Sequence, residues 1–428
     1  MKIVSKERFK TGEEYFRSLI FLSPLILLFF ISLFQVFNLT VLQGDKFQTI
    51  AESNRIYQKP INPVRGFIYD RKGNLLAENI VQRDLYVTPA YILDSSETLL
   101  KLSNLLELPY ENLRDNYLKL VKKQKKFDSF PLVKALNEEQ VAKTKVNLDS
   151  ISGIEVKATL KRFSLYEENF AHILGYVGDV SSEEIQDDIK LADLQNLQIG
   201  KTGIEKKFDA ILRGKPGVQT QERDVKGKLV RVLDTEGAED GQNIYLSIDK
   251  ELQNHLFKFF KNKRGALVAL DPKTGLIRAL ISSPSFNPNI LNSIVDTEEV
   301  KTLFSDKESP LFNRALSGQY PPASTLKPFV GLAAIENQVI SWDKKIEDNG
   351  KYYVEGDPRP YRGWKENGHG LVDMRKAIAE SSDVYFYNLA YDLTLSGMRP
   401  MLENFGFGKK IGLMNIESSG LLPDKKWK

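Results

Sequence analysis

The sequence contains no cysteine, and it has only three histidines and three tryptophans among 428 residues. The absence of cysteine excludes disulfides, thiolate metal sites and cysteine nucleophiles, and it fits an oxidising compartment in which free thiols are a liability. Neither sign of charge dominates, because 60 basic residues stand against 56 acidic ones for a net charge of +4. Basic residues form no stripe and no nucleic-acid-binding motif, so we expect no nucleic acid as a partner.

One long apolar run is present near the N-terminus. Residues 18–37 carry no charge, and about 20 such residues cross a hydrocarbon core. The shorter apolar region and small-residue cleavage site of a signal peptide are not visible. We therefore expect a cytoplasmic tail at 1–17 and a retained transmembrane helix at 18–38; the alternative is a buried soluble helix. Basic residues outnumber acidic ones before the run, which predicts a single-pass protein with most of the chain outside.

Residues 39–245 alternate helical and strand-like segments without a catalytic set of side chains. Their patterns predict hairpins at 67–77 and 218–233, helices at 98–106, 110–123 and 131–144, and a strand at 154–160. We interpret this region as an extended α+β pedestal next to the membrane. A second domain, 246–428, follows with a helix at 251–260, a strand at 265–270, a tight turn at 271–275 and an antiparallel strand at 276–281.

The chemistry centres on residues 320–329, YPPASTLKPF. Ser324 and Lys327 lie three residues apart at the head of an apolar run, so a helix would place the lysine amine within reach of the serine hydroxyl. A serine becomes nucleophilic when a base takes its proton, and a lysine serves as that base when burial leaves it neutral. The alternative is a helix cap followed by a solvated lysine. We interpret the stretch as a Ser-x-x-Lys acyl-transfer site whose helix start also offers backbone N–H groups to an oxyanion.

A second chemical element is Ser381-Ser382-Asp383, which lies between two helical stretches. In a pocket built around Ser324 and Lys327, the Ser381 hydroxyl with the Asp383 carboxylate two residues on could relay a proton to a leaving group. Taken alone, such a segment is also an ordinary helix N-cap.

Together these motifs resemble the penicillin-binding and β-lactam-recognising serine enzymes, whose signature is Ser-x-x-Lys, Ser-x-Asn or Ser-x-Asp, and Lys-Thr-Gly. The resemblance extends to the class B penicillin-binding proteins of the elongation type (penicillin-binding protein two) and covers almost the whole chain. It is carried by the predicted anchor and by the segments at 54–55, 63–73, 200–205, 271–275, 313–315, 320–327 and 368–370. The aspartate in Ser381-Ser382-Asp383 is typical of the elongation type.

The resemblance implies an α+β multidomain fold. A single N-terminal transmembrane helix would precede an extended pedestal of the dimerisation type and an incomplete penicillin-binding/β-lactamase-like α/β transpeptidase domain. It implies that Ser324 is the acylated nucleophile, that Lys327 is its general base, and that Ser381 and Asp383 transfer protons and position substrate. The implied reaction is peptidoglycan D,D-transpeptidation on stem peptides ending in D-Ala-D-Ala, with β-lactams acylating the same serine. The implied partner is a polytopic glycan-polymerising membrane protein, and the implied location is the bacterial inner membrane.

Two departures from the family pattern affect these expectations. The family's Lys-Thr-Gly strand lies downstream of Ser-x-Asp, whereas both such strings here, at 201–203 and 273–275, precede Ser324. We expect neither to serve as the third motif, and the chain is expected to be a C-terminally truncated member. Some relatives bind zinc through two Asp, a His and a Cys; Asp348 and His369 match, but Gly363 and Ser382 stand at the other two positions. Two ligands do not hold a structural zinc, so we predict no metal and no other cofactor.

Two classes of function remain open from the sequence. The first is a membrane-anchored D,D-transpeptidase of cell elongation. The second is a catalytically silent scaffold or β-lactam-binding module that regulates a glycan polymerase. A secreted β-lactamase is disfavoured, because it would carry a cleaved signal and no long membrane-proximal module.

Overall fold

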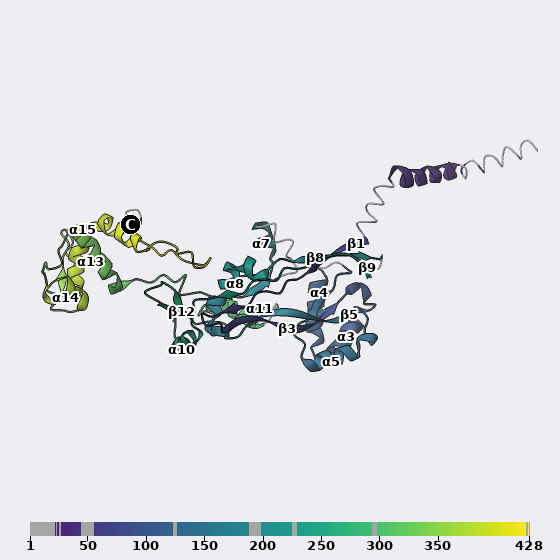
Figure 1. Cartoon of the computed structure of the whole chain (residues 1–428), viewed down its shortest axis with the longest axis horizontal. Coiled ribbons are helices and arrows are strands. Elements are labelled where there is room, and N and C mark those ends of the chain that lie inside the picture. Colours follow the sequence, from purple (N-terminus) through teal and green to yellow (C-terminus); the bar gives the residue numbers. More distant parts are fainter. Residues whose placement is uncertain are drawn as a thin grey trace, which may run out of the picture. The chain divides into compact units, whose positions relative to one another are not determined.

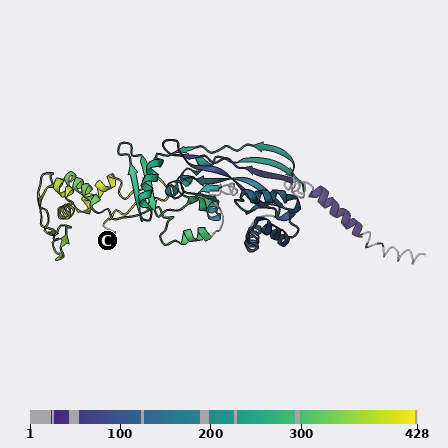
Figure 2. The same ribbon diagram turned by 90° about the horizontal axis from the view of Figure 1, so that it is seen from below.

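The computed structural model describes residues 22, 24, 27–43, 55–122, 126–187, 198–224, 229–292, 298–424 and 427 (Figure 1; Figure 2). By its internal contacts the chain divides into two units, which are described separately. The first comprises residues 1–63 and 215–240, and the second comprises residues 64–214 and 241–428.

The predicted membrane anchor falls at the edge of the described residues. Residues 27–37 form a helix that continues into a π-helical turn, η1 (Asn38–Leu42). In the part of the chain that the structure describes, no helix combines the length and the apolar character that crossing a membrane requires. The predicted tail at 1–17 and residues 18–21, 23, 25 and 26 of the predicted span lie outside the described residues. The transmembrane helix therefore stays a prediction.

The first unit contains a three-stranded antiparallel sheet in the order β1 (Ile56–Ile61), β8 (Gly217–Arg223) and β9 (Leu229–Glu236). The predicted hairpin at 218–233 corresponds to β8 and β9. Glu222 on the central strand forms ion pairs with Arg55 and with Arg231. Every residue of β9 is exposed, so this edge strand offers its side chains to solvent along its whole length.

The second unit is built on a sheet in which β10 (Ile244–Tyr245), β2 (Ile68–Tyr69), β3 (Leu75–Val87) and β4 (Phe130–Val133) follow one another, and β5 (Ile154–Ser164) also pairs with β3. The β2–β3 connection is the hairpin predicted at 67–77. Its turn forms because the Asp70 carboxylate accepts hydrogen bonds from the backbone N–H groups of Lys72 and Asn74, both at 2.8 Å. Gly73 in this turn has φ +82°, a conformation that favours glycine.

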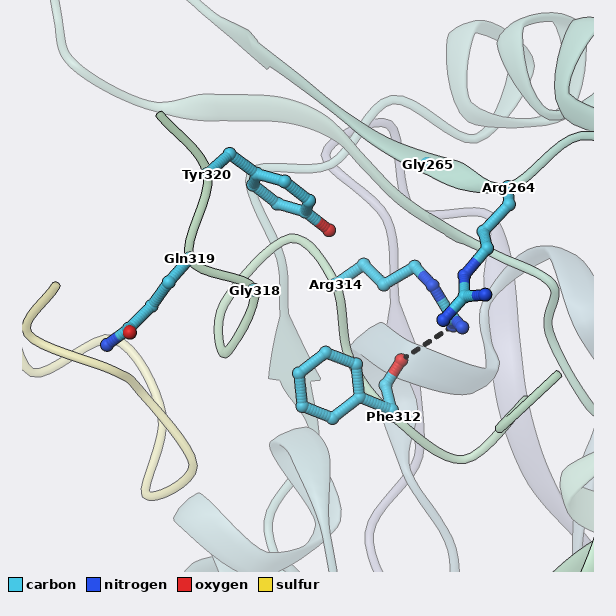
Figure 3. A pocket seen from close by; sticks show the side chains of 7 residues that line it. All are labelled: Arg264, Gly265, Phe312, Arg314, Gly318, Gln319 and Tyr320. Atoms are coloured by element: carbon cyan, nitrogen blue, oxygen red, sulfur yellow. Dashed lines mark hydrogen bonds between the residues drawn. The ribbon is translucent and has the colours of Figure 1, made fainter. Parts of the chain in front are cut away.

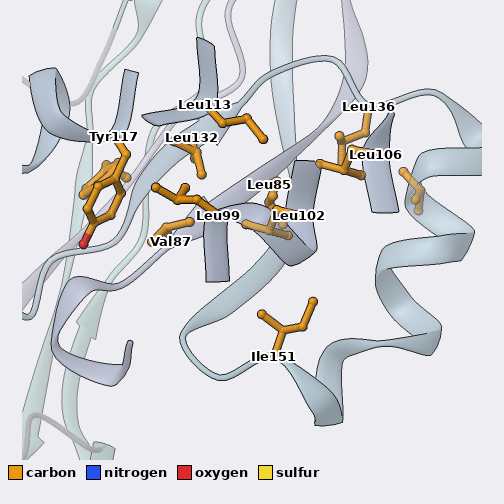
Figure 4. Close-up of a cluster of buried hydrophobic side chains, with 12 residues drawn as sticks. Leu85, Val87, Leu99, Leu102, Leu106, Leu113, Tyr117, Leu132, Leu136 and Ile151 are labelled. Atoms are coloured by element: carbon orange, nitrogen blue, oxygen red, sulfur yellow. The ribbon is translucent and has the colours of Figure 1, made fainter. Parts of the chain in front are cut away.

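Three helices cover one end of this sheet: α3 (Ser95–Leu106), α4 (Tyr110–Val121) and α5 (Glu138–Val146). Leu99, Leu102 and Leu106 follow helical spacing on α3 and pack with Leu85 of β3 in a fully buried cluster (Figure 4). The prediction of one helix over 131–144 was wrong. Residues Phe130–Val133 form the edge strand β4, and the helix begins only at Glu138, where Asn137 makes a capping box with Gln140.

Shorter elements connect this sheet to the rest of the second unit. They are η2 (Pro89–Tyr91), η3 (Leu148–Ser150), η4 (Glu167–Asn169), α6 (Ala171–Leu174), β6 (Val177–Asp179), α7 (Ser182–Asp187), β7 (Gln198–Gly200), α8 (Gly203–Lys207) and α9 (Asp209–Arg213). Glu205 of α8 is almost fully buried and accepts hydrogen bonds from Arg65 at 2.7 Å and Arg162 at 2.6 Å. The two guanidinium groups thereby satisfy a carboxylate that would otherwise be costly to bury.

The C-terminal part of the second unit starts with α10 (Lys250–Phe260) and the antiparallel strands β11 (Gly265–Leu270) and β12 (Ile277–Ser283). Then come α11 (Pro288–Asn292), α12 (Glu298–Ser305), η6 (Ala323–Leu326) and α13 (Lys327–Glu336), two small antiparallel ladders, and α14 (Met374–Ala379) and α15 (Asp383–Asn404). The ladders pair β13 (Ile346–Asp348) with β16 (Gly370–Val372) and β14 (Lys351–Tyr352) with β15 (Tyr361–Arg362). Another buried cluster, including Val330, Ala334, Tyr385 and Leu389, packs α13 against α15.

Candidate active site

Ser324 lies in the 3₁₀ turn η6, directly before α13. The turn follows Pro321 and Pro322, and Ala323 adopts φ +48°. Ser324 is exposed, whereas Val330 and Ala334 on the next turns of α13 are buried. The apolar face of the helix therefore anchors the segment and leaves the serine accessible, with Lys327 at the junction of the turn and the helix.

Ser381 and Asp383 lie in the short connection between α14 and α15. Ser381 has φ +54°, an uncommon backbone conformation for a residue with a side chain. The next residue, Ser382, is the N-cap of α15, and its hydroxyl oxygen accepts a hydrogen bond from the Tyr385 N–H. Asp383 then occupies the first turn of α15, where a carboxylate is favoured by the helix dipole.

These segments meet in one hydrogen-bonded chain. The Ser381 hydroxyl donates to Ser324 Oγ at 2.9 Å. Lys327 Nζ donates to Ser381 Oγ at 3.0 Å, to the Ser381 carbonyl at 2.8 Å and to Asp383 Oδ1 at 2.6 Å. The Lys327 side chain is only 12% exposed. Since an ammonium has three protons to donate, its hydrogen-bonding capacity is filled by these acceptors.

The arrangement brings together all four residues that the sequence singled out, with one difference in connectivity. Among the hydrogen bonds between described residues, none joins Lys327 Nζ to Ser324 Oγ. Ser381 stands between them, because η6 is a 3₁₀ turn and the α-helix begins only at Lys327. The serine and the lysine are therefore linked through a second hydroxyl.

The hollow that holds these groups has a volume of about 330 Å³ and is lined by Ala323, Ser324, Leu326, Lys327, Val330, Asp383, Phe386, Tyr387 and Ala390. Phe386 and Tyr387 were not predicted, although they lie three and four residues after Asp383 on the same helix. Burial, and then the nearby Asp383 carboxylate, raises the pKa of Tyr387 above its usual range. Trp364 was also missed; its backbone N–H donates to Asp383 Oδ2 at 3.1 Å.

Comparisons with known proteins agree with this geometry. The model of the penicillin-binding protein dimerisation domain matches residues 60–246, and that of the penicillin binding protein transpeptidase domain matches residues 265–428. The peptidoglycan D,D-transpeptidase MrdA of Escherichia coli K12 is 32% identical over 436 residues, which cover all of this chain and 69% of that protein. The chain belongs to the penicillin-binding proteins.

Further relatives give the same result. MrdA of Acinetobacter baumannii is 36% identical over 91% of this chain, and MrdA of Haemophilus influenzae is 36% identical over 96% of it. The chain spans 58% and 64% of the length of these two relatives. Among solved structures, the complex of penicillin-binding protein PBP2 with MreC from Helicobacter pylori matches with a TM-score of 0.77 and 29% identity, over 87% of this chain and 70% of that one. The elongation-type family predicted from the motifs is thus confirmed.

The two Lys-Thr-Gly strings of this penicillin-binding protein lie elsewhere in the fold. Lys201 and Thr202 join β7 to α8, which begins at Gly203, and residues 273–275 lie in the tight turn between β11 and β12, in which Gly275 has φ +71°. Neither string lines the hollow at Ser324.

The residues at the family's zinc position do not fit a metal here. Asp348 Oδ2 is hydrogen-bonded directly to His369 Nδ1 at 2.7 Å and to the Ser382 hydroxyl at 2.6 Å, and Gly363 has no side chain to contribute. Burial acts to raise the pKa of Asp348, but hydrogen bonds from Ser382, His369 and the Gly350 N–H outweigh it and lower the pKa. Within the described residues, no three His, Cys, Asp or Glu side chains gather as a metal site would require.

A larger hollow, of about 440 Å³, contains none of the predicted site residues. It is lined by Arg264, Gly265, Phe312, Arg314, Gly318, Gln319 and Tyr320 (Figure 3). Burial, and then the positive charge of Arg264, lowers the pKa of Arg314 below its usual range. The Arg314 guanidinium donates to the backbone carbonyls of Glu308, Ser309 and Phe312. Since this larger hollow offers no nucleophile, we place the candidate active site at Ser324.

Proposed function

We propose that this penicillin-binding protein acts as a peptidoglycan D,D-transpeptidase through an acyl-enzyme at Ser324. The observation that carries the proposal is the hydrogen-bonded chain from Ser324 through Ser381 to Lys327 and Asp383 at a hollow of suitable size. An exposed serine linked to a shielded lysine is the arrangement that activates a hydroxyl for attack on a carbonyl. The relatives named as D,D-transpeptidases support the same reaction.

In the first half-reaction, Ser324 Oγ attacks the penultimate D-Ala carbonyl of a stem peptide. Lys327 first releases one of its three protons to solvent, and the Ser381 hydroxyl turns to donate to the neutral amine instead of to Ser324. The Ser324 proton then passes to Ser381 Oγ as the Ser381 proton passes to Lys327. The C–N bond then breaks, and the terminal D-Ala leaves with a proton returned along Lys327 and Ser381. In the second half-reaction an amine of a neighbouring strand attacks the ester, its proton follows the same route, and Ser324 regains its hydroxyl.

Asp383 has two roles in this scheme. Its Oδ1 stabilises the protonated state of the Lys327 amine, which forms each time a proton arrives. Its Oδ2 accepts the Trp364 N–H and is thereby kept from rotating away. β-Lactams would acylate Ser324 by the same attack.

Covalent labelling with a fluorescent penicillin tests the proposal. We expect the wild-type chain to be labelled and Ser324→Ala to remain unlabelled, while Ser419→Ala, at an exposed serine that does not line the hollow, is labelled like wild type. Label on Ser324→Ala would place the nucleophile elsewhere. A folded but unlabelled wild type would favour the alternative, a catalytically silent scaffold that regulates a glycan polymerase.

We also propose a role for each segment of the chain. Residues 1–17 form a cytoplasmic tail and residues 18–38 a membrane anchor, while residues 39–245 form the pedestal and residues 246–428 the catalytic domain. The large exposed side chains of helix 27–37, including Leu28, Phe30 and Phe34, support insertion into a lipid bilayer, here the bacterial inner membrane.

The exposed apolar residues Leu229, Val230 and Val232 of β9 support the binding of a partner protein at the pedestal. A polytopic glycan polymerase and an MreC-like protein, the latter as in the Helicobacter pylori complex, are the partners we propose.

A further inference from the structure

A buried carboxylate lies directly behind the candidate catalytic turn. Asp348, at the end of β13, is only 2% exposed. Its Oδ2 accepts the Ser382 hydroxyl at 2.6 Å and contacts His369 Nδ1 at 2.7 Å, and its Oδ1 accepts the Gly350 N–H at 2.8 Å. The β13–β16 ladder brings these groups together, because Asp348 pairs with Gly370, the neighbour of His369. Asp348 itself does not line the hollow at Ser324.

The bond to Ser382 acts on both catalytic neighbours of that residue. Ser382 is completely buried and lies between Ser381 and Asp383. Its N–H is bound by the Ala377 carbonyl at 2.9 Å, and its hydroxyl oxygen caps α15 while its proton goes to Asp348. Ser381 holds φ +54°, a conformation that persists in a residue with a side chain when the surroundings enforce it. The fixed Ser382 supplies that constraint.

A second path connects Asp348 to the other side of the turn. The His369 ring is 5.3 Å from the Trp364 ring, centroid to centroid, in an edge-on contact. Trp364 in turn donates its backbone N–H to Asp383 Oδ2 and its indole N–H to the Glu380 carbonyl, both at 3.1 Å. Residues 380 and 383, at the two ends of the turn, are therefore bound by a residue that packs on His369.

We propose that Asp348 is a positioning residue for the Ser381–Asp383 turn, acting through Ser382 and His369 by hydrogen bonds at the place where a metal does not fit. The role rests on the proposed function, because the turn matters for catalysis only if Ser381 and Asp383 transfer protons. A carboxylate that accepts from three donors at once fixes all three in one geometry. Ser382 stands at one of the two positions where a zinc ligand is missing, and its hydroxyl, together with the His369 imidazole, holds Asp348 by hydrogen bonds.

The test uses the full chain with Ser382→Ala, Asp348→Asn and the double variant, and Asp343→Asn as the matched control at an exposed aspartate just before β13. Fluorescent penicillin binding is separated into the affinity of the non-covalent complex and the rate of acylation. We expect each single variant to lower the acylation rate about 10-fold or more, with affinity changed by less than about 3-fold, because the turn positions reacting groups more than it binds substrate. The double variant should lose no more than about the larger single effect, since the Ser382–Asp348 hydrogen bond is shared by both changes.

Amide hydrogen exchange gives a readout that does not depend on acylation. We expect exchange at residues 380–386 to become about 10-fold faster in both variants, with residues 328–336 of α13 unchanged. Acylation and exchange at wild-type values in both single variants would overturn the proposal, as would faster exchange throughout α13 and α15, which signals general destabilisation. If the wild type is not acylated, the proposed function fails and exchange alone decides the positioning role.

Discussion

The hydroxyl groups of Ser381 and Ser324 are hydrogen-bonded at 2.9 Å, and the amine of Lys327 donates to Ser381 instead of to Ser324, the proposed nucleophile. In the proposed mechanism the Ser324 proton therefore travels through Ser381, which lies 57 positions away in sequence. Each side chain in this series of hydrogen bonds can therefore be replaced separately, and each replacement is expected to change the acylation rate by a different amount.

Replacing Ser381 by alanine removes the hydroxyl between Ser324 and Lys327. We expect the rate of acylation by a fluorescent penicillin to fall about 100- to 1,000-fold, because a positioned proton-transfer group contributes on that scale. Gel fluorescence against time measures the rate. Ser419→Ala, at an exposed serine, should react at the wild-type rate. A Ser381→Ala rate within a few-fold of wild type would mean that Lys327 takes the proton directly.

Replacing Asp383 by asparagine keeps the shape of the side chain but removes the charge that pairs with Lys327 at 2.6 Å. The asparagine can still accept the Trp364 N–H. We expect acylation to slow by about 10- to 100-fold, less than in Ser381→Ala. The hydroxyl of Ser381 still links Ser324 to Lys327, but the protonated Lys327 amine loses its anionic partner. Stopped-flow acylation of the two variants gives the comparison. The reverse order of effects would contradict the roles assigned here.

Sequence patterns correctly predicted those helices whose spacing of apolar residues and capping residues lie within the helix segment itself. The helix predicted at 98–106 is present as α3 (Ser95–Leu106) because its leucines recur at helical spacing, and Asp94 caps it by accepting the N–H groups of Ser96 and Glu97. The prediction of a helix at 131–144 was wrong because β4, which occupies the start of this range, is only four residues long and is defined by its pairing with β3. Such pairing involves residues distant in sequence and leaves little local signal.

The candidate site also has features that the sequence predicted and features that it did not. Ser324, Lys327, Ser381 and Asp383 were identified by residue type and spacing, and the structure brings them together. The link through Ser381 could not be derived, because it depends on how α15 packs against α13. Trp364 lies in the irregular segment between β15 and β16, where no periodicity indicates which side chain faces the turn.

Gly363 and Ser382 are the two positions at which the zinc ligands expected from some relatives are missing. A Cβ at Gly363 would lie at least 3.7 Å from its nearest heavy atoms, so the backbone accommodates a side chain there. With Asp348 and His369, Gly363→Asp and Ser382→Cys complete a set of four zinc ligands. We expect the double variant to bind Zn²⁺ about 100-fold more tightly than wild type in calorimetry under reducing conditions.

Gly363→Asp alone is the control for that double variant. It adds a carboxylate but no thiolate, and we expect it to gain much less affinity. Equal affinity of the wild type and the double variant for Zn²⁺ would show that Asp348 and His369 are not placed to complete such a site. Treatment of the wild type with a chelator should leave its penicillin labelling unchanged.

The buried cluster around α3 provides a stability prediction. Leu102 is fully buried, whereas Leu100 on the same helix is 52% exposed. Leu102→Ala removes buried methyl groups and leaves a cavity, so we expect a loss of about 2–5 kcal/mol in the free energy of unfolding. Leu100→Ala should cost less than about 1 kcal/mol. Urea denaturation followed by circular dichroism measures both, and similar losses would contradict the packing seen in Figure 4.

His172 of α6 predicts how stability depends on pH. Burial, assisted by the positive charge of Arg314, lowers the pKa of His172 from 6.5 to about 4, although hydrogen bonds to the backbone carbonyls of Pro284 and Pro310 act in the opposite direction. Below pH 6.5 the unfolded chain therefore binds a proton that the folded chain does not bind until about pH 4. The stability contributed by the neutral ring is present above pH 6.5 and is lost as the pH falls through this range.

His172→Gln removes the titrating group from both states and isolates its effect. Relative to this variant, we expect the wild type to lose about 2 kcal/mol of unfolding free energy between pH 7 and pH 5, since each pH unit below the unfolded pKa costs about 1.4 kcal/mol. Thermal unfolding midpoints of both proteins at pH 4, 5, 6 and 7 measure the difference. The wild-type midpoint should fall more steeply than that of the variant. Parallel curves would mean that His172 accepts its proton equally well in the folded chain.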